Sequence, residues 1–104
     1  MKVRRRARIA ALQALFEVDT ANHDPEVAIR WRLMESPLPT EGEEFCRSLL
    51  YGVLSHTQAL DSVIQDIAPE WPIEQMAAVD RNILRLAAYE IMFDKSAPPK
   101  VAIN

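Results

Sequence analysis

Hydrophobic and polar positions follow one another along this chain with the period of an α-helix. Apolar residues at i, i+3, i+4 and i+7 share one helix face, and this pattern covers residues 3–21, 25–35 and 79–93. Another patterned stretch runs from Thr40 to about Ile67 and lapses near Ser55, which predicts two helices or one bent helix. No segment has the strict alternation that indicates a strand, so we expect an all-α fold.

The breaks between these stretches contain typical helix boundaries. Asp24 precedes Pro25, and an aspartate cap followed by proline in the first turn is a common helix start. Prolines interrupt the pattern at 36–39, 69–72 and 96–99, with a short helical turn expected at 73–77. The strongest predicted helix, 79–93, has a wide apolar stripe that we expect to be buried: Val79, Ile83, Leu84, Leu86, Ala87 and Ile91.

Length and composition fit one small helical domain. The chain has 104 residues, of which 49% are hydrophobic and only two are glycine, too few for a turn-rich β fold. We therefore treat residues 1–104 as a single domain. No apolar run approaches the roughly 20 residues of a membrane span, and the single cysteine cannot form an internal disulfide. We expect a cytoplasmic protein without membrane contact.

Charge is distributed very unevenly along the chain. The net charge is −3, yet five basic residues lie in the first eight positions and the first acidic residue is Glu17. Cations at a helix N-terminus are disfavoured and repel one another, so the cluster indicates an anionic partner such as RNA, whose phosphates match guanidinium geometry. We expect the first turn or two to extend beyond the core. A solvated basic terminus without a partner is the alternative. The candidate RNA-binding residues are Lys2, Arg4, Arg5, Arg6, Arg8 and Gln13.

A second candidate surface lies on the strongest predicted helix. Asn82, Arg85 and Tyr89 have i, i+3, i+7 spacing, which predicts a continuous outer strip, and tyrosine and arginine are enriched at protein interfaces. Asp80 stands at the start of this helix, where capping is its simplest role. These four residues are candidates for binding a partner protein, and an ordinary amphipathic surface is the alternative.

Residues suited to catalysis are sparse. His23 and His56 fall at predicted breaks and have no ligand-like spacing to Cys46. Cys46 lies on an apolar helix face, which favours a core role over a nucleophilic one. No phosphate-binding glycine loop is present in the sequence. We expect no catalytic residue, no metal site, no cofactor and no enzymatic activity.

Three motifs occur in a fixed order along the chain. Arg4-Arg5-Arg6-Ala7-Arg8 opens the first, which continues through Gln13 to Phe16. The second is the stretch VDRNILRLAAYE at 79–90, and the third is PPKVAIN at 98–104. In order and separation, the three motifs resemble the NusB family of transcription antitermination factors, and the resemblance covers nearly the whole chain.

The resemblance implies a fold and a function. It implies a compact helical bundle of two packed helical subdomains. It also implies that the arginine-rich opening contacts boxA-type RNA of ribosomal RNA leader transcripts, and that the helix at 79–90 helps to form a surface for ribosomal protein S10 (NusE). The assembly joins the RNA polymerase antitermination complex and regulates transcription, so the implied mechanism is binding.

The resemblance also bears on the end of the chain. NusB-like proteins continue past the third motif into further helical sequence, so we expect this chain to lack a C-terminal helical segment. We expect self-association into a homodimer to stabilise such a fragment. Two other functions stay open. One is an RNA-binding domain of a ribosomal RNA cytosine methyltransferase, and the other is a helical protein-interaction module that does not bind RNA.

Overall fold

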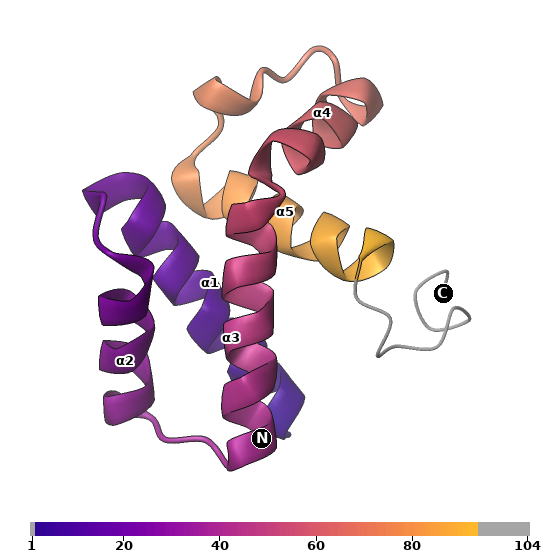
Figure 1. The fold of residues 1–104 in the computed structure, drawn as a ribbon. Coiled ribbons are helices and arrows are strands. Elements are labelled where there is room, and N and C mark those ends of the chain that lie inside the picture. Colours follow the sequence, from indigo (N-terminus) through magenta and orange to yellow (C-terminus); the bar gives the residue numbers. More distant parts are fainter. Residues whose placement is uncertain (1, 94–104) are drawn as a thin grey trace. The chain divides into compact units, whose positions relative to one another are not determined.

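The computed structural model describes residues 2–93, and all regular structure in this range is helical (Figure 1). The all-α prediction is confirmed, and the lapse near Ser55 separates two helices. No helix in this range is both long and apolar enough to span a membrane. The predicted break at 96–99 and the motif at 98–104 lie outside the described residues. The helices are α1 Val3–Ala21, α2 Pro25–Glu35, α3 Thr40–Ser55, α4 Thr57–Ile67, the 3₁₀ helix η1 Ile73–Gln75 and α5 Ala78–Met92.

The chain divides within α3 into two compact units, residues 1–52 and 53–104. The first unit holds α1, α2 and most of α3. The second holds the end of α3 together with α4, η1 and α5. Two helical subdomains are what the family resemblance implied, and each unit is described by itself below.

In the first unit, small side chains let the helices approach closely. α1 and α2 run antiparallel beside each other (Figure 1), and the buried face of α1 consists largely of alanine. Interaxial distance depends on the side chains at the contact, so an alanine face permits short separations. Larger side chains from all three helices complete the core. The fully buried residues of this unit include Ala7, Ala11, Ala14, Ala28, Ile29, Cys46, Leu49 and Leu50.

Two helix caps shape the connection between α1 and α2. Asn22 ends α1 with φ of 58° and donates its backbone N–H to the Val18 carbonyl, a left-handed cap that asparagine tolerates. Asp24 then accepts hydrogen bonds through Oδ1 from the backbone N–H groups of Glu26 at 2.8 Å and Val27 at 3.3 Å. The predicted aspartate cap is therefore confirmed, with Pro25 in the first turn of α2.

In the second unit, polar side chains connect the elements around a small apolar core. Arg85 donates from Nε and Nη2 to both carboxylate oxygens of Asp61, at 2.7 and 2.8 Å, which joins α5 to α4. Gln65 of α4 donates to the Trp71 carbonyl at 2.7 Å and accepts from the Ile73 N–H at 3.2 Å. These bonds hold the loop before η1 against α4. The buried apolar residues are Val53, Leu60, Ile64, Ile73 and Leu86.

The expected burial of the α5 stripe is wrong for most of its residues. Leu86 is buried, but Val79, Ile83, Leu84 and Ile91 are between 40 and 63% exposed. The helix instead turns toward α4 the side that carries Arg85, which binds Asp61. The helical wheel locates an apolar stripe, but which side a neighbouring helix covers depends on tertiary packing. The result is an apolar surface along α5 in the described part of the second unit.

A charged network joins α2 to α3 in the first unit. Arg47 of α3 donates to Glu26 Oε2 at 2.6 Å, and the Tyr51 hydroxyl donates to Glu26 Oε1 at 2.7 Å. The hydrogen bonds from Arg47 and Tyr51 lower the pKa of Glu26 from an ordinary 4.5 to about 2. The ionised carboxylate is thus the form that the folded chain favours.

Replacing this carboxylate should reduce stability in a pH-dependent way. We expect Glu26→Gln to lower the free energy of unfolding by about 1 kcal/mol at pH 7, since bonds to charged but partly exposed groups contribute on that scale. Because the pKa of Glu26 is lower in the folded than in the unfolded state, its stabilisation is present above about pH 4.5. It is lost as the pH falls toward 2.

Urea unfolding followed by circular dichroism at several pH values measures this effect. The matched control is Glu44→Gln, since Glu44 is an exposed residue of α3. A difference between Glu26→Gln and wild type that stays constant from pH 7 to about pH 2 would contradict the assignment.

Candidate nucleic-acid interface

The first two turns of α1 lie against α3. A Cβ atom built at Gly42 would come within 2.5 Å of Val3 Cγ1, so glycine is what allows α1 to begin this close to α3. One turn later Ala7 is fully buried. The expectation that the basic turns extend beyond the core is therefore wrong. Their backbone is part of the packed unit, and the arginine side chains lie at its rim.

Two of the predicted arginines flank an aromatic ring of α3. The guanidinium carbon of Arg4 lies 4.1 Å from the centroid of the Phe45 ring, and that of Arg8 lies 5.5 Å from it. A cation over an aromatic face is attracted by the ring quadrupole. Phe45 therefore orders two guanidinium groups at the surface of the first unit.

A third arginine is held by the backbone. Arg6 donates from Nη2 to the Pro37 carbonyl in the α2–α3 loop at 2.6 Å. Among residues 2–93 it has no carboxylate partner, so its positive charge is fixed in place without being neutralised. Lys2, Arg5 and Gln13 are exposed. The structure thus gathers the predicted basic residues around the first two turns of α1.

Some residues of this surface were not among the sequence candidates. Arg6 and Gln13 line a pocket of about 290 Å³ together with Arg32 of α2 and Ser36, which caps the end of that helix. Arg32 lies in the last turn of α2, and Ser36 follows the end of the helix. Nothing in the sequence indicates that these two residues lie beside α1, because that contact is tertiary. Phe45 was not a candidate either, because its contact with the arginines of α1 is also tertiary.

The predicted outer strip of α5 is wrong as an exposed surface. Asn82 is 1% exposed and donates to the Ala78 carbonyl at 2.8 Å. The Arg85 side chain is 13% exposed and binds Asp61. Tyr89 is half-buried, with its ring centroid 5.9 Å from His56 and 5.7 Å from Phe93. Arg85 thus faces α4, and a helical wheel does not reveal which side of a helix its neighbours cover.

Asp80 has a different environment from these three residues. It is exposed in the first turn of α5, and the cap position is occupied by Ala77, so the expected capping role is wrong. A carboxylate in the first turn still interacts favourably with the helix dipole. Asp80 remains available at the surface of the second unit.

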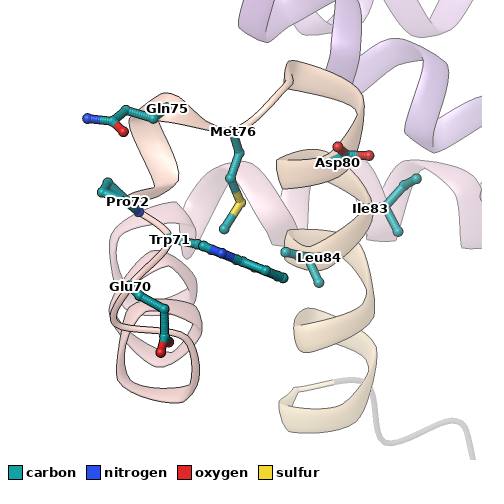
Figure 2. A pocket seen from close by; sticks show the side chains of 8 residues that line it. All are labelled: Glu70, Trp71, Pro72, Gln75, Met76, Asp80, Ile83 and Leu84. Carbon is teal, nitrogen blue, oxygen red and sulfur yellow. The ribbon is translucent and has the colours of Figure 1, made fainter.

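Asp80 lies at the edge of an apolar groove of about 510 Å³ in the second unit. Figure 2 shows the Trp71 indole extending from the loop after α4 toward Leu84 of α5, with Met76 between the two elements. Trp71 is 66% exposed, and the α5 wall is the uncovered apolar face described above. Glu70 and Asp80 are the acidic residues of the lining.

The described residues offer little for catalysis. Cys46 is fully buried, and burial raises the pKa of its thiol to about 11, so the thiol stays protonated near neutral pH. Within residues 2–93 no group of three or more histidine, cysteine or acidic residues could hold a metal ion. The site is therefore a pair of surfaces, one basic and one apolar with acidic residues.

Comparison with known proteins identifies relatives of the whole chain. The family model described as the NusB family matches residues 5–104. The transcription antitermination protein NusB of Roseiflexus sp. (strain RS-1) is 45% identical over 104 residues, which is 98% of this chain and 73% of that protein. The NusB protein of Chloroflexus aggregans is 43% identical over 103 residues, covering 97% of this chain and 69% of that protein.

Solved structures agree with these relatives. The fold is similar to that in a crystal structure of antitermination factors NusB and NusE in complex with dsRNA, with a TM-score of 0.84, 26% identity and coverage of 98% of this chain and 76% of that one. It is also similar to T. maritima NusB, with a TM-score of 0.83, 31% identity and coverage of 99% and 72%. On the family match, the identities and the shared fold, this chain belongs to the NusB family.

Proposed function

We propose that this chain is a transcription antitermination factor that binds boxA-type RNA together with ribosomal protein S10 (NusE). Relatives that are 38 to 45% identical are named transcription antitermination proteins, and one similar structure is a complex of NusB, NusE and dsRNA. The structural observation that supports the proposal most directly is the set of ordered guanidinium groups on the first two turns of α1.

The basic surface of α1 is suited to RNA by its chemistry. Arginine presents planar donors that match phosphate oxygens and can stack on bases. Arg4 and Arg8 are ordered by Phe45, and Arg6 by a backbone carbonyl, so less side-chain entropy is lost when they bind. Lys2, Arg5 and Gln13 complete the proposed RNA-binding set and are exposed.

The groove of the second unit is the proposed contact for S10. Trp71 and the exposed α5 wall supply apolar area, and tryptophan is enriched among the residues that dominate binding energy. Glu70 and Asp80 favour a basic rim on the partner. Of the four predicted partner-binding residues, Asp80 would contact S10 directly. Asn82, Arg85 and Tyr89 would act by holding α5 in place.

The proposed mechanism is binding, without catalysis or a cofactor, in the cytoplasm beside RNA polymerase. A protonated Cys46 is a poor nucleophile, which supports this view. The relatives described above are named antitermination proteins and not methyltransferases. We also propose that residues 1–104 form a single RNA-binding domain and that the chain forms a homodimer.

Charge reversal on α1 should lower the affinity for RNA and make that affinity less dependent on salt concentration. We expect Arg5→Glu and Arg6→Glu each to reduce affinity for a boxA-type single strand by about tenfold or more at low salt. We also expect each to make the slope of log K against log salt shallower by about 0.7, the value for one lost phosphate contact on a single strand. Fluorescence anisotropy titrations from 50 to 300 mM salt (about 0.8 in log units) measure both quantities.

The matched control for these variants is Arg30→Glu. Arg30 is an exposed arginine of α2 whose bond to Glu26 is long, at 3.4 Å, so the variant makes the same charge change elsewhere on the first unit. If Arg5→Glu, Arg6→Glu and Arg30→Glu all bind RNA as wild type does, α1 is not the RNA surface.

Truncating the exposed tryptophan should weaken S10 binding and leave RNA binding unchanged. We expect Trp71→Ala to lower affinity for S10 by about tenfold or more, as for a central aromatic anchor. Asp80→Lys should do so by a smaller factor that falls as salt rises. Isothermal titration calorimetry with purified S10 measures both.

Trp31→Ala is the control for aromatic loss, because Trp31 is 57% exposed on α2 in the other unit. Arg85→Ala tests whether Arg85 holds α5 in place or contacts S10 directly. If Arg85 holds α5, this variant should lower the melting temperature through loss of the Asp61 bonds. Equal S10 affinity for Trp71→Ala and Trp31→Ala would refute the groove as the docking site.

A further inference from the structure

The pocket between α1 and α2 has a composition unlike the rest of the first unit. Its volume is about 290 Å³, and no carboxylate belongs to its lining. That size is near the lower end of small-ligand sites, roughly 300 Å³. The lining combines two guanidinium groups, an amide, a hydroxyl and a small apolar wall: Arg6, Ile9, Ala10, Gln13, Arg32 and Ser36.

Arg6 supplies the unneutralised charge of the pocket. Its bond to the Pro37 carbonyl uses one of the five N–H donors of a guanidinium. A carbonyl orients the group but does not cancel its charge, and no carboxylate among residues 2–93 pairs with it. Arg6 is therefore a preordered donor for an anionic oxygen such as that of a phosphate.

Arg32 has a different role because its charge is already compensated. Its Nη2 donates to Glu17 at 3.1 Å, and its Nη1 donates to Glu35 at 3.4 Å. Glu17 also binds His23 at 2.7 Å, and this hydrogen bond lowers the pKa of the Glu17 carboxyl. Two carboxylates from different helices fix the orientation of the planar group. A fixed guanidinium plane is a surface on which a nucleobase can stack.

The other residues that line the pocket are also suited to contact a nucleobase. Ile9 is 41% exposed, so it offers apolar contact at the surface. Gln13 and Ser36 are exposed and provide amide and hydroxyl groups that can bind a base edge. Single-stranded RNA presents unstacked bases and phosphates together. This pocket contains groups suited to contact a base and a guanidinium group suited to bind a phosphate.

From this arrangement, and resting on the proposed RNA function, we propose that the pocket binds one nucleotide of single-stranded RNA. Arg6 contacts its phosphate, and its base lies against Arg32 and Ile9. The RNA surface thus extends from the arginines of α1 onto Arg32 of α2 and onto Ser36 at the end of that helix. A duplex, in which bases are stacked and paired, would not place a base here.

The test introduces a carboxylate into the pocket without removing a structural bond. Ser36→Glu places a negative charge beside Arg32 and Arg6 at an exposed position. We expect it to weaken binding of a fluorescein-labelled boxA-type single strand by about tenfold or more, within the range that loss of one stacked base produces. Gln13→Glu, at an exposed position of α1, should have the same effect and serves if Ser36→Glu does not fold.

Two controls separate this proposal from the proposed function. Ser62→Glu makes the same substitution at an exposed position of α4 in the second unit and should bind RNA as wild type does. Arg5→Glu reports on the α1 surface alone. If Arg5→Glu loses affinity while Ser36→Glu and Gln13→Glu match Ser62→Glu, the pocket proposal is overturned and the RNA function stands. If the wild-type chain does not bind the RNA, the proposed function itself fails.

Abasic substitution of the RNA tests whether a base enters the pocket. With wild type, removing the base at one position of the strand should reduce affinity by about tenfold, and removal elsewhere should have less effect. With Ser36→Glu the same removal should have little further effect, because the base has already lost its site. Equal sensitivity of the two proteins at every position would overturn base binding in the pocket.

Discussion

Close approach of α1 to its neighbours is the constraint on which the first unit depends. Alanines occupy the buried face of α1, and Gly42 of α3 leaves room for Val3 where α1 begins. Side chains this small bring helix surfaces together at short distance. Residues flanking the contact are then pressed against α2 and α3. Because this packing holds the backbone of α1 in place, it also determines where the arginines of its first two turns lie.

Several arginines of the described residues differ in what holds them. Arg47 and Arg85 each join two helices through a carboxylate, as Arg32 joins α2 to α1. At the start of α1, Arg4 and Arg8 contact an aromatic ring and Arg6 contacts a backbone carbonyl. An ion pair compensates the charge of a guanidinium group, whereas a backbone carbonyl, as at Arg6, only orients it. The chain can therefore have a net charge of −3 and still display an ordered basic surface.

In α5 of the second unit, a polar side chain is buried while several apolar side chains are exposed, which reverses the usual distribution. Asn82 of α5 is buried and bonded to the Ala78 carbonyl of the same helix, and the nearly buried Arg85 is bonded to Asp61 of α4. The apolar residues of the same helix lie at the surface beside Trp71. An exposed apolar face on a small unit is typical of a binding surface. The two units thus present surfaces of different chemistry, one basic and one apolar with acidic residues.

The sequence by itself determined the helices, the cap at Asp24 and the concentration of positive charge in the first turns, because these depend on periodicity and on neighbours within one turn. Tertiary structure decided which side of α5 is covered, what holds Arg4 and Arg6, and the meeting of Gln13 with Arg32. Those contacts join residues far apart in the chain. A helical wheel shows that side chains share a face, but it does not show what that face meets.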